Sequence, residues 1–277
     1  MSANVGTDAM PEQYEEIRSR HNPLIKEIRA ALRRGALSDR GLLPIEGPML
    51  LQEAFKSRAP IDSLLVDDSF VVDSSLRRWL NEQRSRVFRV SPDLMAATAD
   101  TETPAGVLGL VRLPRWNLEP LLSERRGLFL VLVRIQDPGN MGTIIRSAEA
   151  FGVTAILATK ETVSPFNPKA VRASAGSIFR VPIFQGLEEV ELFGHLKTHH
   201  IDTVATSLKA QQSIETERLH LPLALFIGQE AAGLPDDILA ACRDQVRIPT
   251  HESVQSLNVA IATGILLYEI RRYEQNT

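Results

Sequence analysis

The sequence predicts an α/β protein in which a smaller N-terminal α/β domain precedes a larger domain with a mostly parallel sheet and helices on both faces. The 277 residues are 44% hydrophobic, which is enough to bury a sizeable core. Short apolar strands alternate with helical segments along most of the chain, which is typical of a covered, mostly parallel sheet. Residues 113–127 contain two prolines and no strand period, so we predict a linker there.

The N-terminal part is predicted to comprise a flexible tail of residues 1–20 and a domain of residues 21–112. The tail is polar and lacks apolar periodicity. The domain opens with a helix, because apolar residues recur at helical spacing from Leu24 to Leu32. The apolar runs that follow predict strands at 42–47, 61–68, 87–92 and 106–113, with a second helix at 48–57.

The C-terminal domain is predicted to span residues 128–277. Apolar runs of strand length recur through it, and helical segments separate them. The predicted strands are residues 128–135, 153–159, 180–184, 201–206, 223–228 and 245–249.

Composition excludes several classes of protein. A single cysteine, Cys242, rules out a disulfide framework and a cysteine-built metal site. No apolar signal region or run of roughly 18 apolar residues is present, so we expect a cytoplasmic protein without membrane contact. The net charge of −3 hides a basic segment, residues 18–34, with seven basic residues (counting His21) against one acidic. Charge alone leaves open whether this segment contacts nucleic acid or is a solvated helix face.

Three strand ends carry polar residues that packing does not require, and in open α/β sheets ligands bind at such ends. In "IQDPGNMGTIIRSAEAFG", residues 135–152, Asn140 lies between two glycines and Arg146 follows six residues later. This spacing matches neither a dinucleotide fingerprint nor a Walker loop. Glu230 follows the strand 223–228, and Ser256 and Asn258 precede a long apolar helix.

Each of these features also has a purely structural explanation, as a turn glycine or a helix cap. Their recurrence at three strand ends favours a shared site. The central residues include no histidine or cysteine, which disfavours a hydrolase triad or a zinc site.

The segments "NMGTIIRSAEAFG", "FIGQEAAGL" and "IPTHESVQSLNVAIATGILLYE" resemble, in order, the three signature motifs of the SpoU (TrmH-type) branch of the SPOUT RNA methyltransferases. "SPFNPKAVRASAGSIFRVPIF" is similar to the segment between motifs one and two, so the resemblance covers residues 128–272. Upstream, "RHNPLIKEIRAALRR" and "LLPIEGPMLLQEAF" resemble the ribosomal-protein-type substrate-binding domain of many rRNA-directed members.

The resemblance implies methyl transfer from S-adenosylmethionine (AdoMet) to a ribose 2′-hydroxyl of RNA. It also implies a homodimer and a C-terminal trefoil knot, which general topology rules make rare. Backbone groups of Gly228, Ile248 and Leu257 would hold AdoMet. Thr250 and Glu252 depart from the family pattern, which usually has Met and Gly at these positions.

The implied catalytic residues are Asn140, Arg146, Glu230, Ser256 and Asn258. A guanidinium stays protonated, so Arg146 is expected to stabilise the oxyanion or a neighbouring phosphate rather than act as a base. Asn140 would orient Arg146 or the ribose, Glu230 would position the arginine or accept a proton, and no metal is required. The candidates for RNA contact are Lys26, Arg29, Arg33, Arg34, Lys169 and Arg172.

Three alternatives remain at this level. A tRNA substrate is one, although the N-terminal domain favours rRNA, of the 23S type. An RNA-binding protein without catalysis is the second, because the Thr250–Glu252 departure falls in the cofactor wall. A nucleotide-binding dehydrogenase is remote, since the G-x-G-x-x-G fingerprint is missing.

Overall fold

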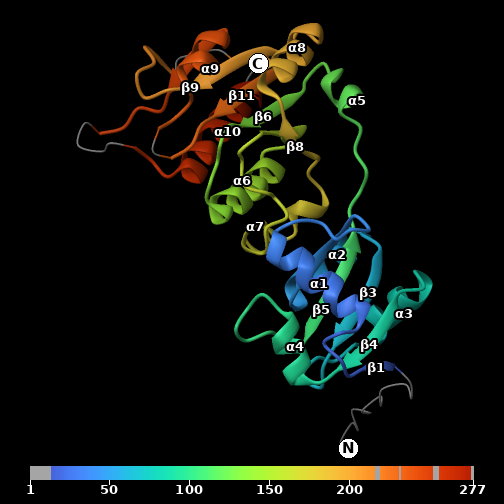
Figure 1. Cartoon of the computed structure of the whole chain (residues 1–277). Coiled ribbons are helices and arrows are strands. Elements are labelled where there is room, and N and C mark those ends of the chain that lie inside the picture. The colour runs from blue at the N-terminus through green and yellow to red at the C-terminus, as the bar shows by residue number, and fades with distance from the viewer. Residues whose placement is uncertain (1–13, 216–218, 231, 252–255, 276–277) are drawn as a thin grey trace, which may run out of the picture. The chain divides into compact units, whose positions relative to one another are not determined.

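The computed structural model describes residues 14–215, 219–230, 232–251 and 256–275. The chain divides into two compact units, Met1–Leu113 and Pro114–Thr277, each built on its own sheet (Figure 1). None of the described helices is long and apolar enough to cross a membrane.

The N-terminal unit has a five-stranded mixed sheet in the order β1-β4-β3-β5-β2, in which β5 is antiparallel to both its neighbours. Helices α1 and α4 pack on one face, and α2 and α3 meet through Phe55 and Trp79. The strands are β1 (Glu15–Ile17), β2 (Leu42–Glu46), β3 (Ile61–Val66), β4 (Arg86–Val90) and β5 (Val107–Arg112). The helices are α1 (Pro23–Arg34), α2 (Pro48–Lys56), α3 (Ser74–Glu82) and α4 (Pro92–Thr98).

Strand β1 corrects the prediction of a flexible tail for residues 15–17. Ile17 is buried in the core of the unit and pairs with Val90 of β4. Pairing of its three residues with β4 and one buried side chain are enough to fix this short edge strand despite its polar composition. Residues 1–13 of the predicted tail lie outside the described residues.

Helix α1 forms where the sequence predicts it, because both of its ends are capped. The Asn22 side chain accepts a hydrogen bond from the backbone N–H of Leu24 at 2.9 Å, and Pro23 occupies the first helical position. Gly35 ends the helix in the left-handed conformation, with φ at 59°. The basic face of α1 is therefore presented on a rigid element.

The C-terminal unit has a seven-stranded sheet in the order β10-β12-β9-β11-β6-β7-β8, and every described pairing in it is parallel. Strand β11 lies between β9 and β6, which leaves the carboxyl ends of β6, β9, β11 and β12 at one edge. The strands are β6 (Leu128–Leu132), β7 (Ala155–Thr159), β8 (Ile183–Leu187), β9 (Asp202–Thr206), β10 (Gln212–Ser213), β11 (Leu223–Ile227) and β12 (Asp244–Arg247).

Helices cover both faces of this sheet, as predicted. Apolar residues of α5, α8 and α9 pack with Phe129, Phe226 and their neighbours on one face, and α6 and α10 lie on the other (Figure 1). The helices are α5 (Leu118–Leu122), α6 (Pro138–Ala150), α7 (Pro168–Ala173), α8 (Glu189–Thr198), α9 (Asp236–Ala241) and α10 (Val259–Gln275), with a 3-10 turn at Ser177–Phe179.

Residues 113–127, predicted to be a linker, contain helix α5 and belong in part to the core. Leu122 is 1% exposed, and Glu119 of α5 contacts His195 and His199 at 3.1 and 3.0 Å. Leu118, Leu121 and Leu122 pack in or against the core and so favour the helix. Pro120 does not prevent it, because it lies within the first turn of α5, where proline is tolerated.

The single cysteine is a structural residue. Burial raises the pKa of the Cys242 thiol to about 12, so the thiol stays protonated and packs as a small apolar group.

We predict that Gly142→Ala disrupts the packing of α6 against α7. A Cβ atom at Gly142 would lie 2.3 Å from the backbone oxygen of Ala170 and 2.5 Å from the Cβ of Ala173. Overpacking of this kind costs roughly 1–3 kcal/mol of unfolding free energy, which urea unfolding measures. Gly194→Ala in α8 is the control, because a Cβ there meets no atom within 4 Å. Equal stability of the two variants would contradict this packing.

Candidate active site

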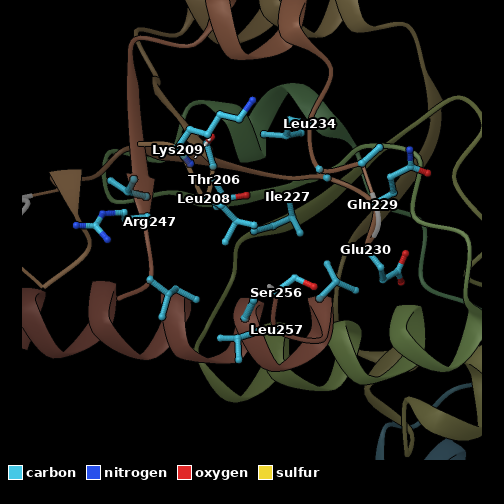
Figure 2. Close-up of a pocket in the computed structure, with 18 of the residues that line it drawn as sticks. Thr206, Leu208, Lys209, Ile227, Gln229, Glu230, Leu234, Arg247, Ser256 and Leu257 are labelled. Carbon is cyan, nitrogen blue, oxygen red and sulfur yellow. Dashed lines mark hydrogen bonds between the residues drawn. The ribbon is translucent and has the colours of Figure 1, made fainter. Parts of the chain in front are cut away.

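A cavity of about 570 Å³ lies at the carboxyl edge of the C-terminal sheet (Figure 2). Its walls come from the segments that follow β9, β11 and β12 and from the start of α10. Its volume suits a ligand of cofactor size. Among the residues that line it are Thr206, Leu208, Lys209, Ile227, Gly228, Glu230, Leu234, Arg247, Ile248, Thr250, Ser256 and Leu257.

A chain of side-chain amides connects three of the predicted catalytic residues. Asn140 Nδ2 donates to Glu230 Oε1 at 2.6 Å, and Asn258 Nδ2 donates to Asn140 Oδ1 at 2.9 Å. Asn258 Oδ1 accepts from the backbone N–H groups of Ala260 and Ile261 and so caps α10. Residues 90 and 118 positions apart in the sequence thus form one hydrogen-bonded unit.

The hydrogen-bonding capacity of these groups determines how the side-chain amides of Asn140 and Asn258 are oriented. A carboxylate only accepts hydrogen bonds, so Asn140 must direct its NH2 group towards Glu230 and its oxygen towards Asn258. The oxygen of Asn258 is held by the helix terminus, which leaves its NH2 group for Asn140. The N-terminus of α10 therefore sets the orientation of the Glu230 carboxylate through two amides.

Asp137 holds the backbone on the other side of Asn140. Its Oδ1 accepts from the Asn140 N–H at 2.8 Å and caps α6, and its Oδ2 accepts from Lys169 Nζ at 3.0 Å. The Lys169 ammonium, together with the backbone N–H of Asn140, holds the pKa of Asp137 below its usual value. Asp137 is therefore a fixed anchor rather than a proton donor.

Gly228 is required by the turn that carries Glu230. A Cβ atom at Gly228 would lie 2.2 Å from the carbonyl carbon of Gly233, and the Gly233 N–H donates to the oxygen of Gln229 at 3.0 Å. The backbone thus folds back on itself at the end of β11, and Gly228 and Gly233, which have no side chains, both line the cavity. Such a wall suits a ligand recognised through backbone hydrogen bonds, as expected for AdoMet.

The structure brings most of the predicted site residues together. Gly228, Ile248 and Leu257, predicted to hold the cofactor, all line the cavity, as do Glu230 and Ser256.

Arg146 stands apart from this group. It is exposed on α6, makes no ion pair within the described part of the chain, and projects from the helix about 120° away from Asn140, because six residues advance a helix by about 600°. The described hydrogen bonds of the Asn140 side chain go to Glu230 and Asn258 rather than to Arg146.

The predicted RNA-contacting residues lie in two places. Lys26, Arg29 and Arg33 recur at helical spacing on one side of α1, whereas Arg34 pairs with Asp39 at 2.8 Å. In the C-terminal unit, Arg172 is half-buried in α7 and Lys169 pairs with Asp137.

Sequence reasoning missed Lys209 and Leu208, which line the cavity from the turn after β9. The sequence contained a signal for these two residues, because they follow β9, another parallel strand whose carboxyl end reaches the same edge of the sheet. Thr250 lines the cavity, while Glu252 lies outside the described residues. In the ranges that the structure describes, no three His, Cys, Asp or Glu side chains are grouped so as to hold a metal ion.

Comparison with known proteins matches two family models to the two units. Residues 127–268 match the SpoU rRNA Methylase family, and residues 22–109 match the MRM3-like substrate binding domain. The first match covers the sheet, the cavity and the amide chain.

Similar proteins extend over nearly the whole chain. An uncharacterised tRNA/rRNA methyltransferase of Synechocystis sp. is 34% identical over 93% of this chain and 94% of its own. The Bacillus subtilis 23S rRNA (guanosine(2553)-2′-O)-methyltransferase RlmP is 29% identical over 93% of this chain and 99% of its own. The crystal structure of an AdoMet-bound rRNA methyltransferase from Sinorhizobium meliloti superposes with a TM-score of 0.82, at 29% identity, over 94% of this chain and 98% of that one. With the motifs, the α/β sheet and the family match in agreement, the chain belongs to the SpoU rRNA methylase family.

Proposed function

We propose that the protein transfers a methyl group from AdoMet to a ribose 2′-hydroxyl of ribosomal RNA, of the 23S type. The observation that carries this proposal is the amide chain that orients Glu230 at the wall of a cofactor-sized cavity. The similarity to RlmP over nearly the whole chain supports rRNA rather than tRNA, and so does the MRM3-like domain.

The residues that would hold AdoMet through their backbone groups are Gly228, Ile248 and Leu257, all of which line the cavity. When bound there, AdoMet supplies an electrophilic methyl group on a sulfonium. Gly228 adds no side chain to this wall where it approaches Gly233, which fits recognition through the main chain at that point.

The protein's own residues then activate the hydroxyl. The ribose oxygen attacks the methyl carbon, the O–C bond forms as the C–S bond breaks, and the hydroxyl proton passes to the carboxylate of Glu230. Asn140 holds Glu230 Oε1 at 2.6 Å, which leaves Oε2 for the ribose. Ser256, in the same cavity wall, is placed to hydrogen-bond the ribose or the cofactor.

A methyl-transfer assay tests the proposed function. Purified protein, labelled AdoMet and 23S rRNA transcripts should yield label in an alkali-resistant dinucleotide, since 2′-O-methylation removes the nucleophile of alkaline cleavage. Label in a base, in tRNA alone, or in no RNA would contradict the proposal. Binding of RNA without any transfer would support the non-catalytic alternative.

We also propose a homodimer and the trefoil knot that the family resemblance implies. The match of residues 127–268 to the SpoU rRNA Methylase family supports the knot. Ile261 and Tyr268, 58% and 52% exposed and seven residues apart on α10, provide an apolar face that a second copy could cover. A concentration-independent monomer in sedimentation would contradict the dimer.

For Arg146 we predict a catalytic effect without a loss of cofactor affinity. If the guanidinium stabilises charge that develops in the transition state, Arg146→Ala lowers the single-turnover rate by roughly 100- to 1000-fold. Arg146→Lys should recover little, because it lacks the planar fork. Unaltered AdoMet binding and melting temperature are the controls. An Arg146→Ala variant that binds AdoMet and RNA and reacts at the parent rate would rule out a catalytic role for Arg146.

Two substitutions separate the role of Asn258 as the cap of α10 from its hydrogen bond to Asn140. Asn258→Ala removes the cap of α10 and should cost about 1 kcal/mol of unfolding free energy. Asn258→Asp keeps the cap but presents an oxygen to Asn140 Oδ1, so it should fold stably and still lose methyl transfer. Melting curves and single-turnover rates distinguish the two effects. Full activity of Asn258→Asp would show that the hydrogen bond to Asn140 is dispensable.

The face of α1 formed by Lys26, Arg29 and Arg33 is predicted to contact RNA phosphates. Reversing the charges of Arg29 and Arg33 should weaken RNA binding and reduce the salt slope by about 1.5, because each phosphate contact contributes roughly 0.7–0.9. AdoMet affinity should not change. Arg78→Glu, exposed on α3, is the matched control. An unchanged salt slope would show that this face of α1 is solvated and does not contact RNA phosphates.

A further inference from the structure

The cavity contains a cationic group that the proposed reaction does not yet use. The basic side chains in its described lining are Lys209 and Arg247, and neither has a carboxylate partner among the described residues. Other cations of the same unit are paired, for example Arg126 with Glu274 and Lys169 with Asp137. The charge of Lys209 is therefore available to a ligand.

Lys209 lies on a turn that the backbone holds in place. The Ser207 N–H donates to the oxygen of Val246 in β12 at 3.0 Å, which fastens the turn to the sheet. Ser207 Oγ accepts from the Lys209 N–H and its carbonyl oxygen accepts from the Ala210 N–H, each at 3.2 Å. These bonds fix the start of the Lys209 side chain at the cavity wall.

The direction of the two basic side chains differs. In the view of Figure 2 the Lys209 side chain extends towards Leu234, on the side away from Ser256 and Leu257, whereas the guanidinium of Arg247 points away from the other labelled residues. Figure 2 also places Lys209 and Glu230 on opposite sides of the cavity. A ligand that reacts next to Glu230 would therefore extend its far end towards Lys209.

We propose that Lys209 Nζ binds the α-carboxylate of AdoMet and makes the site selective for cofactors that carry this group. The inference rests on the proposed function, which places the sulfonium methyl beside Glu230. The carboxylate is the only anionic group of AdoMet, and it terminates the chain that leads away from the sulfonium. The neighbouring Leu208, 63% exposed in the same wall, offers apolar surface to the rest of the ligand.

An RNA phosphate is the other anion that Lys209 could bind. The presence of Lys209, with Leu208, in the lining of a cofactor-sized cavity favours the carboxylate. Removal of the Lys209 charge should lower the affinity for AdoMet if Lys209 binds the carboxylate, and the affinity for RNA if it binds a phosphate. Titrations with both ligands therefore decide between the two assignments.

Calorimetric titration with AdoMet and with decarboxylated AdoMet tests the proposal, because these compounds differ only in the carboxylate. Lys209 is exposed, so Lys209→Ala should weaken AdoMet binding by about 2- to 5-fold, as expected for a solvent-exposed ion pair, and should leave the affinity for the decarboxylated compound unchanged or slightly higher. Lys209→Arg should retain most of the affinity for AdoMet. Lys197→Ala removes the same charge from an exposed position on α8, outside the cavity lining, and should change neither affinity.

Each outcome bears on one claim. Equal weakening of both compounds by Lys209→Ala, or weakening of neither, would overturn the carboxylate assignment. If AdoMet affinity is kept while RNA affinity and its salt slope fall, Lys209 binds a phosphate instead. A parent protein that binds neither compound would contradict the proposed function itself rather than the role of Lys209.

Discussion

The hydrogen bond between Asn140 and Glu230 is the interaction on which the site depends. It joins the start of α6 to the turn after β11, and Asn258 extends it to the N-terminus of α10. Each amide in this chain has one orientation that satisfies both neighbours. The result is a carboxylate held by protein groups before any substrate arrives, and such preorganisation is the general source of electrostatic catalysis.

The parallel sheet makes this arrangement possible. Parallel strands deliver their carboxyl ends to one edge, so polar residues that follow different strands meet without any covalent connection. This constraint is why Asn140, Glu230, Ser256 and Asn258 could be grouped from the sequence alone. The strand periodicity located the ends of the strands, and Gly228 marked the turn after β11, whereas Gly139 and Gly142, expected in a turn, lie in the first turns of α6.

Other features depend on contacts that periodicity does not reveal. Strand β1 forms because Ile17 finds an apolar core beside Val90, far away in sequence. The pairing of Lys169 with Asp137 could not be read from the sequence, because 32 residues separate the partners. Lys209 has no motif around it, and only the three-dimensional position of the turn after β9 shows that it lines the cavity. In each case a tertiary contact, rather than a local pattern, determines the role of the residue.

The central claim is that Asn140 and Glu230 act as one catalytic unit, and a double-mutant cycle on single-turnover methyl transfer tests it most directly. The cycle compares Asn140→Ala, Glu230→Gln and the double variant, all at saturating AdoMet and RNA. If Asn140 serves to orient Glu230, the double variant should react about as slowly as the slower single variant. Rate losses that multiply in the double variant would show that the two side chains act independently, and would contradict this account.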